Sequence, residues 1–202
     1  MKKTGLLVVS IIVIIGSVWA ILGRYYQPTQ KVRPPELMAV GTVAAEEVRK
    51  LAPAAGKVVL VVCHGPVEML GMEMIVESFQ QAFPGTVTER IAVKNFVDRT
   101  AATQELLGLL EKQAEVDVVV TIGGAGFLDE SALVNSSQSL PRLVPVLSFL
   151  PVQLKALLAA QRVPFGIMPN PKAEPPERKP QTAHEWFDTA FVIVTPQTPA
   201  IE

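Results

Sequence analysis

The sequence is poor in the residues that build metal and disulfide sites, with one cysteine and two histidines among its 202 residues. The single cysteine, Cys63, excludes an internal disulfide bond and any zinc site made of several cysteines. Two histidines are too few for a histidine-rich metal site. We therefore expect no metal and no other cofactor.

The sequence also lacks an excess of either charge, with 18 basic and 19 acidic side chains and a formal net charge of −1. Lys and Arg are not concentrated anywhere in the way that binding to a phosphate backbone requires. Nucleic acid is therefore not an expected partner. A Walker loop and a Gly-x-Ser-x-Gly elbow are absent too, which excludes the enzyme classes that depend on them.

One long apolar run stands at the N-terminus, where residues 4–23 carry no charge. As a helix rising ~1.5 Å per residue, this run matches a hydrocarbon core ~30 Å thick, so it predicts a span of a lipid bilayer. The alternative is a cleavable signal peptide ending at Val18-x-Ala20. We favour an uncleaved anchor, because the apolar run continues past Ala20 to Leu22 and because Trp19, Tyr25 and Tyr26 fit an interfacial aromatic belt.

These features divide the chain into an anchor over residues 1–26, a proline-rich spacer over 27–36 and a domain over 37–202. An amphipathic helix over 37–52 should pack on the flank of that domain. We expect a single-pass membrane protein whose domain lies outside the cytoplasm, in the periplasm if the source is a bacterium.

The domain is organised around Asp117-Val-Val-Val-Thr-Ile-Gly-Gly-Ala-Gly, an apolar run that ends in glycines. Such a run without polar alternation is typical of a strand covered on both faces. Similar runs over 57–62 and 143–149 alternate with helical patterns. The prediction is an α/β fold with a single doubly wound, mostly parallel sheet of five to six strands in an order near 2-1-3-4-5, with edge strands at 86–93 and 190–194.

Ligands of such sheets bind beyond the carboxyl ends of the strands. That rule gives Gly65, Gly123, Gly124, Gly126, Ser148 and Asn170 as candidate ligand-binding residues, together with Cys63 and His64 as candidate catalytic residues. The glycines after the central strand could let backbone amides approach an anion. A tight turn is the interpretation we favour, because Asp129 stands where a dinucleotide fingerprint needs its third glycine.

The layout from Lys57 to Met168 resembles one lobe of the type I periplasmic-binding proteins. The resemblance is carried by Asp117-Val-Val-Val-Thr-Ile-Gly after a helix and by Val144-Pro-Val-Leu-Ser-Phe in the next strand. It implies a ligand that is clamped between two lobes. This chain is long enough for only one such lobe. A second copy or another protein would then have to cover the ligand, or the lobe would serve as a protein-binding scaffold.

Cys63-His64-Gly65-Pro66 resembles locally the cysteine elbow of the DJ-1/PfpI-like hydrolases. A thiol at the N-terminus of a helix is favoured as the thiolate, which would suit a nucleophile. In that family, however, the Gly-Gly strand precedes the cysteine, whereas here Gly123-Gly124 follows it. We favour a buried, inert thiol, and do not expect an enzyme.

A helix over 66–83 shows an apolar arc wider than packing on one side requires. Val67, Leu70, Met74, Ser78 and Ala82 form the stripe expected to face the sheet. A second stripe, made of Met69, Met72, Val76 and Phe83, is then a predicted partner surface. The alternative is that the N-terminal helix of the domain covers it.

Three functions remain. The first is a noncatalytic accessory or scaffold subunit of a membrane protein complex, with other membrane proteins or a second copy as partners. The second is a lobe that recognises a small solute. The third is a cysteine-dependent hydrolase.

Overall fold

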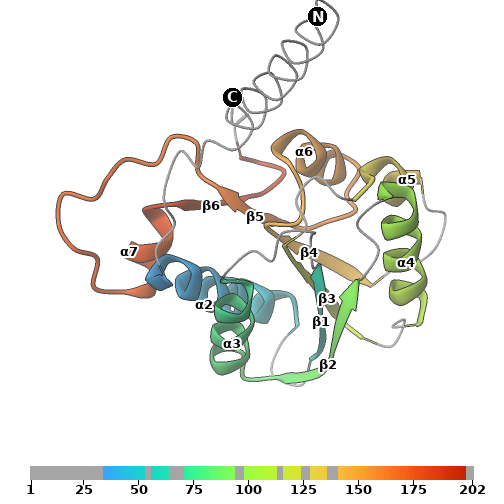
Figure 1. Cartoon of the computed structure of the whole chain (residues 1–202), viewed down its shortest axis with the longest axis horizontal. Coiled ribbons are helices and arrows are strands. Elements are labelled where there is room, and N and C mark those ends of the chain that lie inside the picture. Colours follow the sequence, from blue (N-terminus) through green and yellow to red (C-terminus); the bar gives the residue numbers. More distant parts are fainter. Residues whose placement is uncertain are drawn as a thin grey trace, which may run out of the picture. The chain divides into compact units, whose positions relative to one another are not determined.

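The structure, a computed structural model, describes residues 34–52, 56–63, 71–93, 98–112, 116–123, 128–135 and 141–198. They belong to one compact unit, within Val32–Glu202. Helix α2 (Pro34–Leu51) comes first, and strands and helices alternate after it (Figure 1). Where the sequence predicts a flanking helix over 37–52, the structure has α2, which begins at Pro34 and so includes residues 34–36 of the predicted spacer; proline is favoured in a first helical turn.

A six-stranded sheet in the order β2-β1-β3-β4-β5-β6 forms the middle of this unit. Its strands are β1 (Lys57–Cys63), β2 (Thr86–Val93), β3 (Val118–Ile122), β4 (Arg142–Val146), β5 (Gly166–Pro169) and β6 (Phe191–Val194). Neighbours from β2 to β5 pair in parallel, and β6 pairs antiparallel with β5. The predicted sheet order and both predicted edge strands are thus confirmed.

Strand β3 holds the central position that its sequence predicts. All five of its residues are buried, and its register with β1 and β4 covers the whole strand. Pro145 of β4 pairs opposite Thr121 without interrupting this register. Between β4 and β5, only Val146 and Ile167 are paired. This pair of neighbouring strands therefore has the shortest paired stretch among the described strands.

Helices cover both faces of the sheet, as a doubly wound fold requires. On one face α2, α3 (Met72–Ala82) and α7 (Ala183–Asp188) pack on alternate strand residues such as Val58, Val120 and Ile122. On the other face, α4 (Arg99–Lys112), α5 (Glu130–Asn135) and α6 (Pro151–Ala159) pack on Val59 and Val119. Figure 1 shows the sheet between these two groups of helices.

Helix α2 covers part of the sheet face on which the strand-to-strand connections place only one helix. With this strand order, right-handed crossovers place α4, α5 and α6 on one face and only α3 on the other. Helix α2 lies beside both α3 and α7 on that second face, and its residues Val40, Ala44 and Val48 are fully buried. The extra N-terminal helix is therefore part of the core.

The predicted partner surface on the helix after β1 is corrected by the structure. Met72, Val76 and Phe83 are only 6%, 0% and 5% exposed and belong to the core on the α2 side. Met74, expected to face the sheet, is 39% exposed instead. Ser78, from the stripe expected to face the sheet, is also buried, so α2 and the sheet together bury residues of both stripes. Met69 lies outside the described residues.

Within the described ranges, no helix is both long enough and apolar enough to cross a bilayer. The predicted anchor over 4–23 lies outside those ranges.

Candidate functional site

The neighbouring strands β3 and β4 end at paired residues, and the residue after each strand has a left-handed backbone conformation. Gly123 has φ 75° and Leu147 has φ 57°. Gly123 N–H donates to the Val146 carbonyl over 2.9 Å, and Leu147 N–H donates to the Ile167 carbonyl over 2.9 Å. A non-glycine residue in this region costs about 1 kcal/mol. The hydrogen bond to Ile167 therefore helps to keep Leu147 in this costly conformation, and β4 ends at this point.

Ser148 and Asn170, two predicted ligand-binding residues at this edge, make contacts within the chain. Ser148 is 1% exposed, and its Oγ lies 2.8 Å from the Thr121 carbonyl and 3.2 Å from that of Val146. Asn170 accepts the Lys172 N–H at Oδ1 over 3.0 Å, and its own N–H donates to the Ala190 carbonyl over 2.8 Å. A ligand-binding role for either residue stays a prediction. The hydrogen bonds described here hold the backbone in place where β4 and β5 end.

The other predicted site residues differ in what the structure describes of them. Gly123 is buried and lies at a turn, the interpretation favoured from the sequence. Cys63 ends β1, but nothing of its side chain is described. The remaining candidates lie outside the described residues: His64, Gly65, Gly124 and Gly126.

The N-terminal ends of α4, α5 and α6 meet beside this edge, in what we call the helix corner (residues 98–103, 128–131 and 150–153). The Leu128 carbonyl accepts from Arg99 Nη2 over 3.1 Å and from Gln153 Nε2 over 3.0 Å. Gln153 Nε2 also donates to Glu130 Oε2 over 2.8 Å, and Arg99 Nη2 lies 3.7 Å from the same oxygen. One carbonyl and one carboxylate therefore join the three helices.

Thr103 adds a second connection inside the helix corner. This fully buried side chain donates from Oγ1 to the Arg99 carbonyl over 2.7 Å and accepts the Asp129 N–H over 2.7 Å. The start of α5 is thus bonded to the first turn of α4. Such a network of satisfied polar groups makes the corner a rigid platform.

Two aspartate side chains accept hydrogen bonds from backbone N–H groups in the helix corner. Asp98 Oδ1 accepts from the Thr100 and Ala101 N–H groups over 2.8 and 3.3 Å, so Asp98 caps the N-terminus of α4. Asp129 Oδ1 accepts from the hydroxyl and the N–H of Ser131 over 2.7 and 3.0 Å. The hydrogen bond from the Ser131 side chain is the main cause that lowers the pKa of Asp129. The N-terminal ends of α4 and α5 therefore each have a carboxylate of the chain itself beside their N–H groups.

Apolar side chains are exposed on the same corner. Leu150 is 46% exposed and Val152 is 71% exposed, and Pro151 between them is exposed as well. Gln153 holds this segment in place, because its Oε1 accepts the Leu150 N–H over 2.9 Å. The corner thus presents an apolar tip on a rigid polar base.

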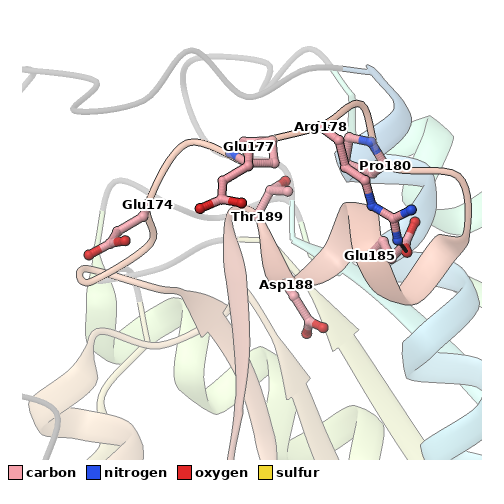
Figure 2. Close-up of a pocket in the computed structure, with 8 residues that line it drawn as sticks. Glu174, Glu177, Arg178, Pro180, Glu185, Asp188 and Thr189 are labelled. Carbon is pink, nitrogen blue, oxygen red and sulfur yellow. Dashed lines mark hydrogen bonds and ion pairs between the residues drawn. The ribbon is translucent and has the colours of Figure 1, made fainter.

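A hollow of about 600 Å³ lies at the carboxyl end of β5, beneath the proline-rich loop over 170–182 (Figure 2). Four carboxylates and one guanidinium line it, in the set Glu174, Glu177, Glu185, Asp188 and Arg178, with Pro176, Pro180 and Thr189. Figure 2 shows Arg178 reaching to Glu185, while Glu174 and Glu177 lie farther along the loop. The hollow is thus acidic.

Glu185 fixes the loop above this hollow. It accepts the Gln181 N–H at Oε2 over 2.6 Å and pairs with Arg178 Nη2 over 2.7 Å. The Gln181 backbone hydrogen bond is the leading cause that lowers the pKa of Glu185, and the charge of Arg178 adds to it. Thr182 and Glu185 also form the capping box that starts α7.

No protein-family model and no curated protein matches the sequence. Solved structures resemble the fold at low identity. A sugar-binding protein of a sugar ABC transporter from Bacillus halodurans matches 80% of this chain and 62% of its own length, with 13% identity and a TM-score of 0.55. A solute-binding protein from Agrobacterium vitis bound with α-D-tagatopyranose matches 81% and 59%, with 15% identity and a TM-score of 0.53.

AraP, an arabinose-binding protein from Geobacillus stearothermophilus, matches 79% of this chain at 17% identity with a TM-score of 0.52. The chain spans 61% of AraP's length, and 46% and 43% of two further sugar-transporter proteins that resemble it. At such identities the likeness concerns the fold alone. The described residues have the fold of a lobe of a type I periplasmic-binding protein.

Proposed function

We propose that this chain is a noncatalytic, membrane-anchored accessory subunit of a membrane protein complex, and that its lobe binds a partner protein through the helix corner. The observation that carries the proposal is the apolar tip at Leu150 and Val152. Elsewhere among the described residues, the large apolar side chains that are exposed are Met38 and Met74.

The chemistry of the corner favours a protein over a sugar. A sugar is held by polar groups that point toward it. At this edge, the side chains of Ser148, Gln153 and Thr103 are bonded to groups of the chain itself. An exposed apolar centre surrounded by satisfied polar groups is the arrangement of a protein interface.

The proposal is tested with Val152→Glu in the full-length chain. Because this side chain is 71% exposed, the charge should leave the melting temperature unchanged. It should nevertheless reduce the partner recovered on gentle purification from detergent by about tenfold, since a buried unpaired carboxylate is costly in an interface. Met74→Glu, an exposed apolar residue on the opposite face, is the matched control and should keep the partner. Equal recovery by both variants would contradict the proposal.

A second candidate function, recognition of a small solute, is favoured by the acidic hollow and by the sugar-binding proteins that share the fold. Carboxylates can accept hydrogen bonds from sugar hydroxyls. D-arabinose or α-D-tagatopyranose at a hundred times its Kd should then raise the stability by about 2.7 kcal/mol. A melting temperature unmoved by both sugars would argue against this candidate.

A further inference from the structure

Helix α4 and strand β2 lie at the side of the lobe where the sheet ends. Strand β2 comes first in the sheet order, and among the described residues it pairs on one side only, with β1. Helix α4 contacts β2 and also α5 (Figure 1). An edge strand presents backbone N–H and C=O groups that can pair with a strand of another chain. This side of the lobe can therefore take up a partner.

A stripe on α4 lies apart from the face that the helix buries. The buried face consists of Ala102, Thr103, Leu106 and Leu110. Four other residues follow one another at spacings of three, one and three, and so share a second face of the helix. We call them the α4 stripe: Glu105, Gly108, Leu109 and Lys112. The first three are half-buried and Lys112 is exposed, so the stripe is accessible along its length.

The glycine of the α4 stripe is not needed by the chain itself. Gly108 lies inside α4, where glycine lowers the stability of a helix relative to alanine. A Cβ built on Gly108 would meet nothing within 4 Å, so no neighbour in the chain excludes a side chain there. A residue without Cβ does, however, let a second helix approach closely, because the distance between packed helices depends on the side chains at their contact.

The charges of the α4 stripe are complementary to those of a second α4 stripe. Neither Glu105 nor Lys112 has an ion-pair partner among the described residues. If two α4 helices pair antiparallel about a twofold axis between Gly108 and Leu109, Glu105 of each copy lies opposite Lys112 of the other. The same register sets Leu109 of each copy opposite Gly108 of the other. The stripe is thus self-complementary in both charge and shape.

We propose that a second copy of this chain docks on this side of the lobe, with the two α4 stripes packed antiparallel and the two β2 edges paired. One twofold axis perpendicular to the sheet serves both contacts, because it reverses each element and keeps both helices on the same face. Leu109 of each copy fills the space beside Gly108 of the other, and two ion pairs flank this apolar centre. The dimer uses neither the helix corner nor the acidic hollow, so the inference goes beyond the proposed function.

The test is the mass of the full-length chain in detergent, measured by sedimentation equilibrium over a range of protein concentrations. We expect a monomer–dimer equilibrium with a Kd of about 10 µM or tighter. Glu105→Lys and Lys112→Glu should each weaken the dimer at least tenfold, because like charges then lie opposite each other. Lys155→Glu makes the same charge change at an exposed residue of α6 and should leave the Kd unchanged.

Mixing the two charge variants of the α4 stripe tests its register. Glu105→Lys has two lysines on the stripe and Lys112→Glu has two glutamates, so an equal mixture should form heterodimers about as tightly as the wild type dimerises. Such rescue cannot come from a variant that has merely lost its fold. Gly108→Leu should raise the melting temperature of the monomer, since leucine is the better helix former, and should weaken the dimer at least tenfold by filling the space that Leu109 needs.

The outcomes that would overturn the proposal follow from the same measurements. A wild type that stays monomeric would leave the α4 stripe to a different protein. Charge variants that dimerise as tightly as the wild type would show that the dimer forms elsewhere. A mixture of the two charge variants that stays monomeric, or Gly108→Leu with an unchanged Kd, would exclude the antiparallel register.

Discussion

Thr121 is the residue where the core of the sheet departs from simple apolar packing. It lies in β3, is 0% exposed, and its Oγ1 is a buried side-chain oxygen without a hydrogen-bond partner among the described residues. Its backbone carbonyl is used, because Ser148 Oγ donates to it over 2.8 Å. An unpaired buried hydroxyl has lost its hydrogen bonds to water and gained none in return.

Thr121→Val should therefore stabilise the protein. Valine keeps the shape and removes the unpaired oxygen, so we expect the free energy of unfolding to rise by about 1 kcal/mol. Thr121→Ser, which keeps the hydroxyl and removes a methyl group, should lower it by about 1 kcal/mol. Denaturant unfolding of the three proteins checks this. A destabilised Thr121→Val would mean that the hydroxyl has a partner.

At the scale of the element, the contact between α2 and α3 depends on a glycine. A Cβ built on Gly41 would lie 2.2 Å from the Ile75 carbonyl oxygen and 2.8 Å from the Phe79 nitrogen. These are backbone atoms, which cannot rotate away. The Ser78 hydroxyl, bonded to the Met74 carbonyl over 2.6 Å, fills the space that a side chain at Gly41 would need. The close approach of the two helices thus requires a residue without Cβ.

Gly41→Ala should push these helices apart. We expect a loss of about 1–3 kcal/mol, as for overpacking elsewhere in cores. Gly108→Ala is the matched control, because Gly108 lies inside α4 and a Cβ there meets nothing within 4 Å. The control should gain up to about 1 kcal/mol from helix propensity. Should thermal unfolding give both changes the same sign, the close packing is not the reason for Gly41.

The elements also show which features the sequence could predict. Unbroken apolar runs predicted β1 and β3, and alternation with helices predicted the sheet order. The orientation of α3 was predicted wrongly, because periodicity reveals an apolar stripe without saying what covers it. Helix α7 was missed, since it is short, although the capping box Thr182-x-x-Glu185 could have indicated its start.

The helix corner could not be predicted, because its contacts are long-range. Arg99 and Gln153 meet at the carbonyl of Leu128, 29 and 25 residues away in the sequence. No local pattern signals such a meeting. The cap at Asp98 differs, since a cap and its helix are neighbours in the chain and a local pattern can signal them.

For the molecule as a whole, α2 is the element that continues toward the N-terminal run. It is bonded to α7, because Thr189 Oγ1 lies 3.1 Å from Glu36 Oε1 and His184 Nε2 lies 3.2 Å from Glu46 Oε2. It also packs closely on α3. Residues from Pro34 onward thus join α2 to both of its neighbours on this face of the lobe.

We accordingly expect attachment to the membrane and folding of the lobe to be separable. The full-length chain should stay in the membrane fraction through alkaline extraction, since its uncharged run over 4–23 is long enough to span ~30 Å. Deleting residues 1–33 should release the protein while leaving its melting transition in place. Fractionation with N-terminal sequencing checks the first expectation and calorimetry the second. A mature, soluble protein beginning near Ile21 would instead show that the run is a cleaved signal peptide.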